Sequence, residues 1–177
     1  MVEEAQQYGV SVAAHANTKE GIARAIKAGA KSIEHGRGFD EELIDQALAA
    51  GVYWCPTMLV REYYESASDK IYQQLGLAYR KGLPIVLSTD IGSLPWTVNQ
   101  AKELEYYVKK AGMSPMDAIK SGTSTAAALL NGQEVIGQIK EGFLANIIAV
   151  AGNPLEDITL LQDVRFVMRS GKIYKRP

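Results

Sequence analysis

Hydrophobic and polar positions along the chain alternate between two periods. Four short runs rich in β-branched and apolar residues alternate at every second position and predict strands. The predicted strands are residues 9–16, 31–36, 52–57 and 83–90. Apolar residues at helical spacing separate them, in 18–30, 39–51 and 63–82. Strands joined by helical crossovers run parallel, because each crossover returns the chain to the same edge, so an α/β fold is expected.

Polar residues mark two helix starts. Asp40 is expected to cap the helix that follows it, and Ser114 followed by Pro115 is expected to open another. Two further helical stretches are residues 99–112 and 123–132. After Gly132 the pattern changes to short runs joined by Gly, Asn and Pro turns, and the predicted strands there lie in 137–142, 144–152 and 164–174. We therefore expect residues 1–131 to form a (β/α) unit and residues 132–177 a separate segment of β-strands.

Two architectures fit four strand–helix units. One is a doubly wound open sheet and the other is a (β/α)8 barrel. A complete barrel needs about 250 residues. A chain of 177 residues could supply about half of one.

Composition and charge exclude several classes of partner. There are 19 Lys and Arg against 20 Asp and Glu, with no basic run, so binding to nucleic acid or an anionic membrane is not expected. The acidic start lacks an apolar signal region, and no stretch approaches about 20 apolar residues. A single cysteine, Cys55, cannot form an internal disulfide and is expected to be a buried small hydrophobe. We expect a cytoplasmic protein.

The candidate chemistry lies at strand ends. His15 and His35, the only two histidines, and Asp90 each stand at the carboxyl end of a different predicted strand. Parallel α/β folds place their working side chains there, so the three are expected at one mouth, with Glu34 on the face opposite His35. Imidazole and carboxylate bind Zn²⁺, Mn²⁺ or Fe²⁺, and a catalytic site needs about three such ligands. The alternative is that each is an ordinary hydrogen-bonded residue.

Four sequence motifs resemble those of a known family. SVAAHAN (11–17), GIARAIKAGAKSIEHG (21–36), CPT (55–57) and LSTDIG (87–92) resemble the metal-dependent amidohydrolase superfamily, in its imidazolonepropionase-like and Xaa-Pro dipeptidase-like branch. The ending, from AAALLN through VMRSGKI, is similar to that family's passage from the last barrel helix into a small β-sandwich. The resemblance implies the C-terminal half of a TIM-like (β/α)8 barrel, strands 5–8, with part of the composite sandwich.

The resemblance also implies roles for the three candidates. His15 matches the metal-binding histidine of strand 5 and His35 that of strand 6, which in some members holds the attacking water or substrate instead. Asp90 matches the strand-8 aspartate, which binds metal and carries protons. The implied activity is hydrolysis of a C–N bond in a small amide, peptide or cyclic amide by water activated on one or two divalent ions, with zinc expected.

Several family features have no counterpart in this chain. The strand-1 His-x-His pair and the strand-4 bridging residue are absent, so we expect the isolated chain to lack turnover. Where the branch often reads Pro-His-Gly-x-Asn, residues 95–99 keep only the Pro and Asn, leaving Trp96 and Asn99 as candidates for substrate contacts. The alternative reading is a non-catalytic half-barrel that works only in an assembly. That assembly would be a homodimer or a pairing with a separate N-terminal half.

Overall fold

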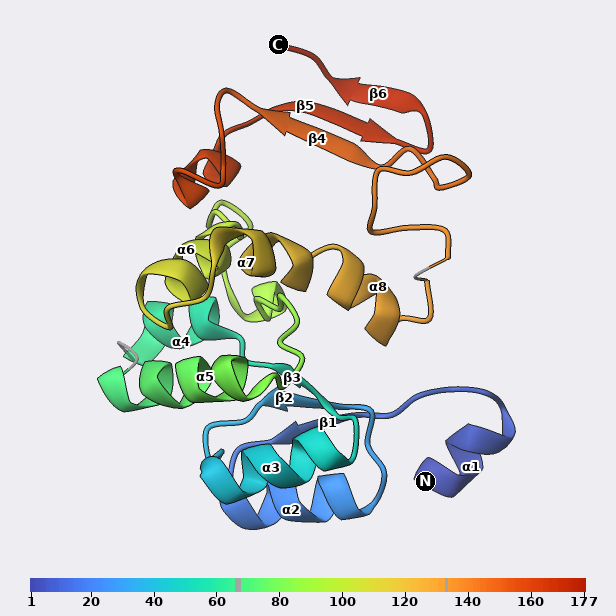
Figure 1. Cartoon of the computed structure of the whole chain (residues 1–177), viewed down its shortest axis with the longest axis vertical. Helices are drawn as coiled ribbons and strands as arrows, with labels where there is room; N and C mark the ends of the chain where they lie inside the picture. The colour runs from blue at the N-terminus through green and yellow to red at the C-terminus, as the bar shows by residue number, and fades with distance from the viewer. Residues whose placement is uncertain (66–67, 133) are drawn as a thin grey trace.

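The computed structural model describes residues 1–65, 68–132 and 134–177, and it shows an α/β protein with two three-stranded sheets (Figure 1). The helices are α1 Val2–Gln7, α2 Lys19–Lys27, α3 Glu41–Ala49, α4 Met58–Glu65, α5 Asp69–Lys81, α6 Lys102–Lys109, α7 Pro115–Ser121 and α8 Ser124–Leu129. The strands are β1 Ala13–Ala16, β2 Ser32–His35, β3 Tyr53–Cys55, β4 Ile147–Val150, β5 Val164–Arg169 and β6 Lys172–Lys175. Two 3-10 turns are η1 Ile91–Ser93 and η2 Ile158–Gln162.

The first sheet contains β1, β2 and β3 in that order, all parallel, as the alternating pattern predicts. The predicted fourth strand, 83–90, forms only one β-bridge, between Ile85 and Trp54. Trp54 exchanges backbone hydrogen bonds of 2.9 Å with Pro84 and Val86, so the segment starts beside β3. The amide of Leu87 then donates to Ser121 at the end of α7. The prediction of a full strand is therefore wrong, because the chain leaves the sheet at residue 87.

The start of the chain also differs from its pattern. The alternation predicts a strand from residue 9, but β1 begins at Ala13, and α1, which the pattern does not predict, precedes it. The amide of Val10 donates to the carbonyl of Ala5, so residues 9 and 10 end the helix instead of joining the sheet. Val10 is consequently exposed.

The predicted helix starts are confirmed. The Asp40 side chain accepts from the amide of Leu43 at 3.1 Å, and Ser114 accepts from Asp117 at 3.1 Å. The predicted helix 63–82 is found as α4 and α5, on either side of residues 66 and 67, which lie outside the described residues. Both helices are amphipathic and pack their apolar faces on the core.

The core fixes the carboxyl end of β2. Trp54 is fully buried against Phe39, with ring centroids 4.5 Å apart, and its indole N–H donates to the carbonyl of His35 at 3.1 Å. Gly36 has φ +62°, and a Cβ there would lie 2.5 Å from the Trp54 indole nitrogen. Glycine is required at this position by both its left-handed backbone and the close indole.

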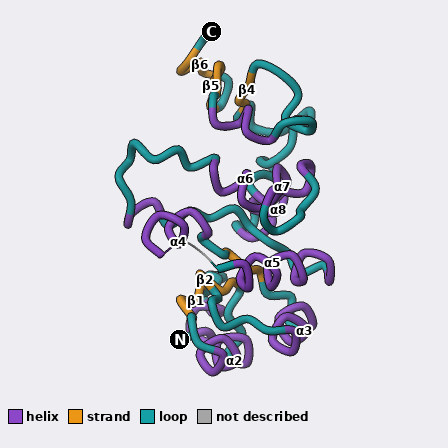
Figure 2. The backbone as a smooth tube through the Cα atoms, turned by 90° about the vertical axis from the view of Figure 1, so that its left-hand side faces the viewer, coloured by secondary structure: helices purple, strands orange, loops and turns teal. Residues whose placement is uncertain are grey.

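The second sheet is antiparallel, in the order β4, β5, β6, and the stretch 137–142 forms turns instead of the predicted strand. Figures 1 and 2 show it at the opposite end of the molecule from β1–β3, with α6 and α7 between the two sheets. The side chain of Gln162 in η2 donates to Glu105 of α6 at 2.7 Å, which ties this part to the helices. In the described part of the chain, none of the helices is long and apolar enough to cross a membrane.

Candidate functional site

The two histidines meet at the carboxyl ends of β1 and β2. Their ring centroids lie 4.4 Å apart, with the rings inclined at 66°. The parallel pairing of the two strands brings them together, because β1 and β2 end side by side. His15 is exposed and His35 is half-buried. The structure therefore places the two predicted imidazoles at one rim.

His35 reaches His15 against the regular alternation of the strand. In the ladder His15 pairs with Glu34 and Ala16 with His35, so a regular strand would turn His35 to the opposite face from His15. His35 has φ 67°, a left-handed conformation that is uncommon for a residue with a side chain. This backbone conformation ends the alternation at His35. Glu34 pairs with His15 in the ladder and lies on the same face. Because His35 turns toward His15, Glu34 is not on the face opposite His35 as expected.

Thr57 orients the His35 ring. The Nδ1 atom of His35 and the hydroxyl of Thr57 lie 2.8 Å apart in a hydrogen bond. Thr57 itself is buried and has φ 50°, a strained conformation for a β-branched residue. Thr57 was not singled out from the sequence. It could have been, because Thr57 is the last residue of the CPT motif and stands at the carboxyl end of the third predicted strand, as the histidines do in theirs.

Electrostatics around His35 favour a neutral imidazole. Partial burial is the main cause that lowers its pKa, and the neighbouring His15 lowers it further. Asp90 and Glu34 oppose this shift with their negative charges. Neutral imidazole is the form that binds a metal ion or accepts a proton.

The face of the sheet that carries His15 also carries a small polar group. The hydroxyl of Ser32 donates to the carboxylate of Glu34 at 2.6 Å. Cys55 of β3 is the residue that pairs with Glu34 across the two strands. Burial raises the pKa of the Cys55 thiol well above its usual range, and the charge of Glu34 adds to this. The thiol therefore stays protonated, and the prediction that Cys55 is a buried small residue is confirmed.

Asp90 stands apart from the histidine pair. It has φ 53°, precedes η1, and its carboxylate accepts a hydrogen bond from the Ser93 hydroxyl at 3.3 Å. Its charge acts on His35, but the side chain is exposed to solvent. Within residues 1–65, 68–132 and 134–177, no three His, Cys, Asp or Glu side chains gather closely enough to hold a metal ion. The expected convergence of all three residues is therefore met by His15 and His35 alone.

The histidine pair provides part of the ligand set of a divalent ion. Imidazole nitrogens are ligands that suit Zn²⁺, and the contact of His35 Nδ1 with Thr57 leaves Nε2 as the nitrogen of His35 that could bind an ion. Two ligands are fewer than the three that a catalytic zinc site uses. The pair fits part of a metal site, and a complete one needs further ligands.

The two candidate substrate contacts differ in their surroundings. Trp96 is 77% exposed, on the loop that follows η1. Asn99 uses its amide within the protein, because Nδ2 donates to the carbonyl of Gln162 at 2.6 Å and Oδ1 accepts from the amide of Ala101. Asn99 thus joins the start of α6 to η2.

Thr57 provides a first test of the site. Thr57→Val keeps the β-branched shape but removes the hydroxyl that holds His35, and it is expected to weaken Zn²⁺ binding by about 10–100-fold. Isothermal titration calorimetry measures the change. Thr125→Val, half-buried on α8, is the matched control and should bind as the parent does. Equal affinity of both variants would show that the hydroxyl does not orient the ring.

Two curated enzymes are similar to this chain in sequence. The chain is 34% identical over 197 residues to the ochratoxinase of Aspergillus niger, an alignment that covers 100% of this chain and 40% of the relative. It is 30% identical over 158 residues to the imidazolonepropionase of Aeromonas hydrophila, covering 86% of this chain and 38% of the relative. The chain thus spans less than half the length of these relatives.

Solved structures and a family model extend the comparison. The crystal structure of a Xaa-Pro dipeptidase with bound methionine in the active site superposes with a TM-score of 0.91 at 38% identity, covering 98% of this chain and 47% of that one. The ochratoxinase structure superposes with a TM-score of 0.89 over 99% of this chain. The model of the amidohydrolase family matches residues 1–174. This chain therefore belongs to the amidohydrolase family.

Proposed function

We propose that this chain is part of a metal-dependent amidohydrolase that cleaves the C–N bond of a small amide with activated water. The observation that carries the proposal is the pair of imidazoles, 4.4 Å apart at the ends of adjacent parallel strands, in a chain of this family. In this proposal residues 1–131 supply the part of a (β/α)8 barrel that contains strands 5–8, with the segment beside β3 that begins at residue 83 in the place of the last strand. Residues 132–177 supply part of a composite β-sandwich.

Each residue has a proposed role. His15 and His35 would hold the divalent ion, zinc by the chemistry of its donors, and Asp90 would join them once the ligand set is complete. When bound at these residues, the ion would lower the pKa of a water and would polarise the amide carbonyl. Asp90 would accept the proton of the attacking water as the C–O bond forms, and deliver it to the nitrogen as the C–N bond breaks. Thr57 would hold the His35 ring in its binding orientation.

The relatives narrow the choice of substrate. One solved relative is a Xaa-Pro dipeptidase and one curated relative is an imidazolonepropionase, so a dipeptide and a cyclic amide are the first candidates. We propose a small-molecule amide or dipeptide. Trp96, exposed on the loop beyond η1, is the candidate for a substrate contact.

The proposal extends to a further part of the protein. The chain covers 40% of the ochratoxinase and 47% of the Xaa-Pro dipeptidase, and the described residues offer two close ligands. We propose that the other ligands come from a segment outside these 177 residues. The isolated chain would then bind zinc weakly and would not turn over substrate.

The test has two steps. The chain with Zn²⁺ is first assayed against a panel of Xaa-Pro dipeptides and N-acyl amino acids, and no turnover is expected. The DNA upstream of Met1 is then read for an in-frame His-x-His, and the longer product is assayed with the same panel. Hydrolysis by the longer product is expected. Hydrolysis of the panel by the isolated chain at ordinary enzymatic rates would contradict the proposal that its site is incomplete. A zinc-loaded longer product that hydrolyses none of the amides would contradict the proposed amidohydrolase function.

A further inference from the structure

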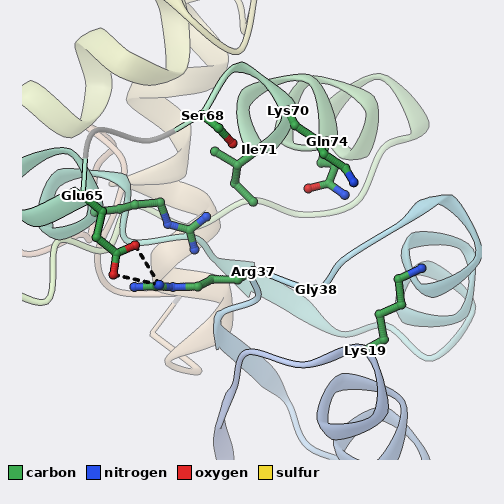
Figure 3. Close-up of a pocket in the computed structure, with 9 residues that line it drawn as sticks. Lys19, Arg37, Gly38, Glu65, Ser68, Lys70, Ile71 and Gln74 are labelled. Carbon is green, nitrogen blue, oxygen red and sulfur yellow. Dashed lines mark hydrogen bonds and ion pairs between the residues drawn. The ribbon is translucent and has the colours of Figure 1, made fainter.

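A pocket whose lining does not include His15 or His35 opens beside α4 and α5. It has a volume of about 430 Å³ and lies between the loop after β2, the α4 helix and the first turn of α5 (Figure 3). Its charged lining residues are Lys19, Arg37, Arg61, Lys70 and Glu65. Four cations thus face one anion, and the pocket carries an excess of positive charge.

Arg61 is the buried part of this excess. It lies on α4 and is only 6% exposed. Its Nε and Nη2 atoms are buried and have no hydrogen-bond partner among the described residues. Burying an unpaired guanidinium is costly, because the charge loses its hydration and gains no counterion. In the part of the chain that the structure describes, Arg61 forms no ion pair that would offset this cost.

The other charges do not neutralise it. Glu65 forms an ion pair with Arg37 at 2.7 Å, and Lys19 pairs with Asp40 at 2.5 Å. Figure 3 shows Glu65 and Arg37 joined on one side of the pocket, with Lys70 on the other. The one anion of the lining is therefore already engaged, and the positive charge of Arg61 and Lys70 remains.

The first turn of α5 adds to the attraction for an anion. This helix is 13 residues long and starts at the pocket, where Ser68, its N-cap residue, makes no capping hydrogen bond with its side chain. The free N–H groups at a helix start and the helix dipole both favour negative charge. A helix start and a buried, unpaired guanidinium therefore line the same pocket.

We propose that this pocket binds an oxyanion, a carboxylate or a phosphate, between Arg61 and the start of α5. A guanidinium and backbone N–H groups are the donors that such anions accept from, and both are present. Burial lowers the pKa of Arg61 and the nearby Arg37 lowers it further, while the charges of Glu65 and Glu103 oppose this shift. A bound anion would add a hydrogen-bonded counterion to the guanidinium. The proposal concerns a site other than the histidine pair and does not depend on the hydrolytic function.

The position of the pocket connects it to the candidate active site. The amide of Arg61 faces the carbonyl of Thr57 at 3.4 Å, one helical turn away, and Thr57 holds His35. Arg37 follows His35 by two residues along the chain. An anion bound at Arg61 would thus lie next to the elements that position His35, as the carboxylate of an amino-acid ligand or as a separate phosphate.

The test measures binding by the full 177-residue chain, without metal and in the presence of a chelator. Calorimetry is run with N-acetyl-L-alanine, with its neutral analogue N-acetyl-L-alaninamide, and with inorganic phosphate, all at one ionic strength. One saturable site is expected for an anion and none for the amide. Binding of N-acetyl-L-alanine identifies the carboxylate, and binding of phosphate alone identifies the phosphate. Absence of saturable binding by either anion would overturn the proposal.

Variants assign the site. Arg61→Lys keeps a charge but loses the planar guanidinium, and it is expected to weaken binding at least about 10-fold. Should that variant fail to fold, Lys70→Gln, exposed at the rim, is expected to weaken binding by a smaller factor. Lys27→Gln, exposed at the end of α2, is the control and should bind as the parent does. Unchanged binding by folded Arg61→Lys would overturn the assignment, whatever the hydrolysis assays show.

Discussion

Replacing both histidines with alanine, His15→Ala together with His35→Ala, is expected to abolish specific Zn²⁺ binding by the chain. The two rings are the close donor pair of the candidate site, and the sequence has no other imidazole to replace them. Each single replacement is expected to cost at least about 100-fold, because loss of an outer hydrogen-bond partner alone costs about 10–100-fold. Isothermal titration calorimetry at Zn²⁺ concentrations that saturate the parent measures the loss.

Folding and non-specific binding need separate controls. His15 is exposed and His35 half-buried, so the double variant should keep the circular dichroism spectrum of the parent. Glu3→Gln removes an exposed carboxylate from α1 and should leave zinc binding unchanged. Retention of a single tight zinc site by the double variant would show that the ion binds elsewhere and would remove the basis for the catalytic proposal.

Local features of the fold were predictable from the sequence because local chemistry decides them. A side-chain oxygen of Asp40 or Ser114 can reach an amide three residues ahead wherever the chain turns into a helix. Strand extents depend on partners that the pattern does not show. Val10 alternates like a strand residue, yet its amide bonds to α1, and Leu87 leaves the sheet for the end of α7.

The site was predictable in its location and less so in its geometry. Strand ends in a parallel sheet meet at one edge, which is enough to bring His15 and His35 together. Alternation alone would have kept them on opposite faces, and the left-handed backbone at His35 reverses that. Asp90 belongs to a segment with a strand partner on one side only, so its position follows from the turn after it.

The pocket around Arg61 could not be predicted from the sequence. Arg61 stands in the run VREYY of an amphipathic helix, where an arginine is ordinarily solvated. Its burial depends on α5 and on the loop after β2, which are distant along the chain and close in space. A charge without a partner appears only once all three elements are packed.

Glu103 gives the second large expected effect, on the pH dependence of stability. It lies on α6, fully buried, and its carboxyl group accepts from the amides of Met58 at 2.8 Å and Leu59 at 2.5 Å, the first residues of α4. Burial is the main cause that raises its pKa from 4.5 to about 7, while those two hydrogen bonds oppose the shift. Between these values the folded protein holds a proton that the unfolded chain has released.

The sign of the effect follows from linkage. The stability that protonated Glu103 contributes is fully present below pH 4.5 and is lost as the pH rises through about 7. Glu103→Gln cannot titrate. Between pH 4.5 and 8 its free energy of unfolding should therefore rise relative to that of the parent, by up to about 3 kcal/mol. The two proteins are compared by how their free energies of unfolding change with pH. Their absolute values differ at every pH, because the Gln side-chain N–H₂ replaces one of the two acceptors and lowers stability.

Urea unfolding at a series of pH values measures this difference. Glu105→Gln is the matched control, two residues along the same helix, where hydrogen bonds from Lys109 and Gln162 lower the pKa of Glu105. The stability that ionised Glu105 contributes is lost as the pH falls, so this variant should change the slope in the acid range and in the opposite sense. Parallel curves for the parent and Glu103→Gln between pH 4.5 and 8 would mean that Glu103 remains ionised, held by the first turn of α4.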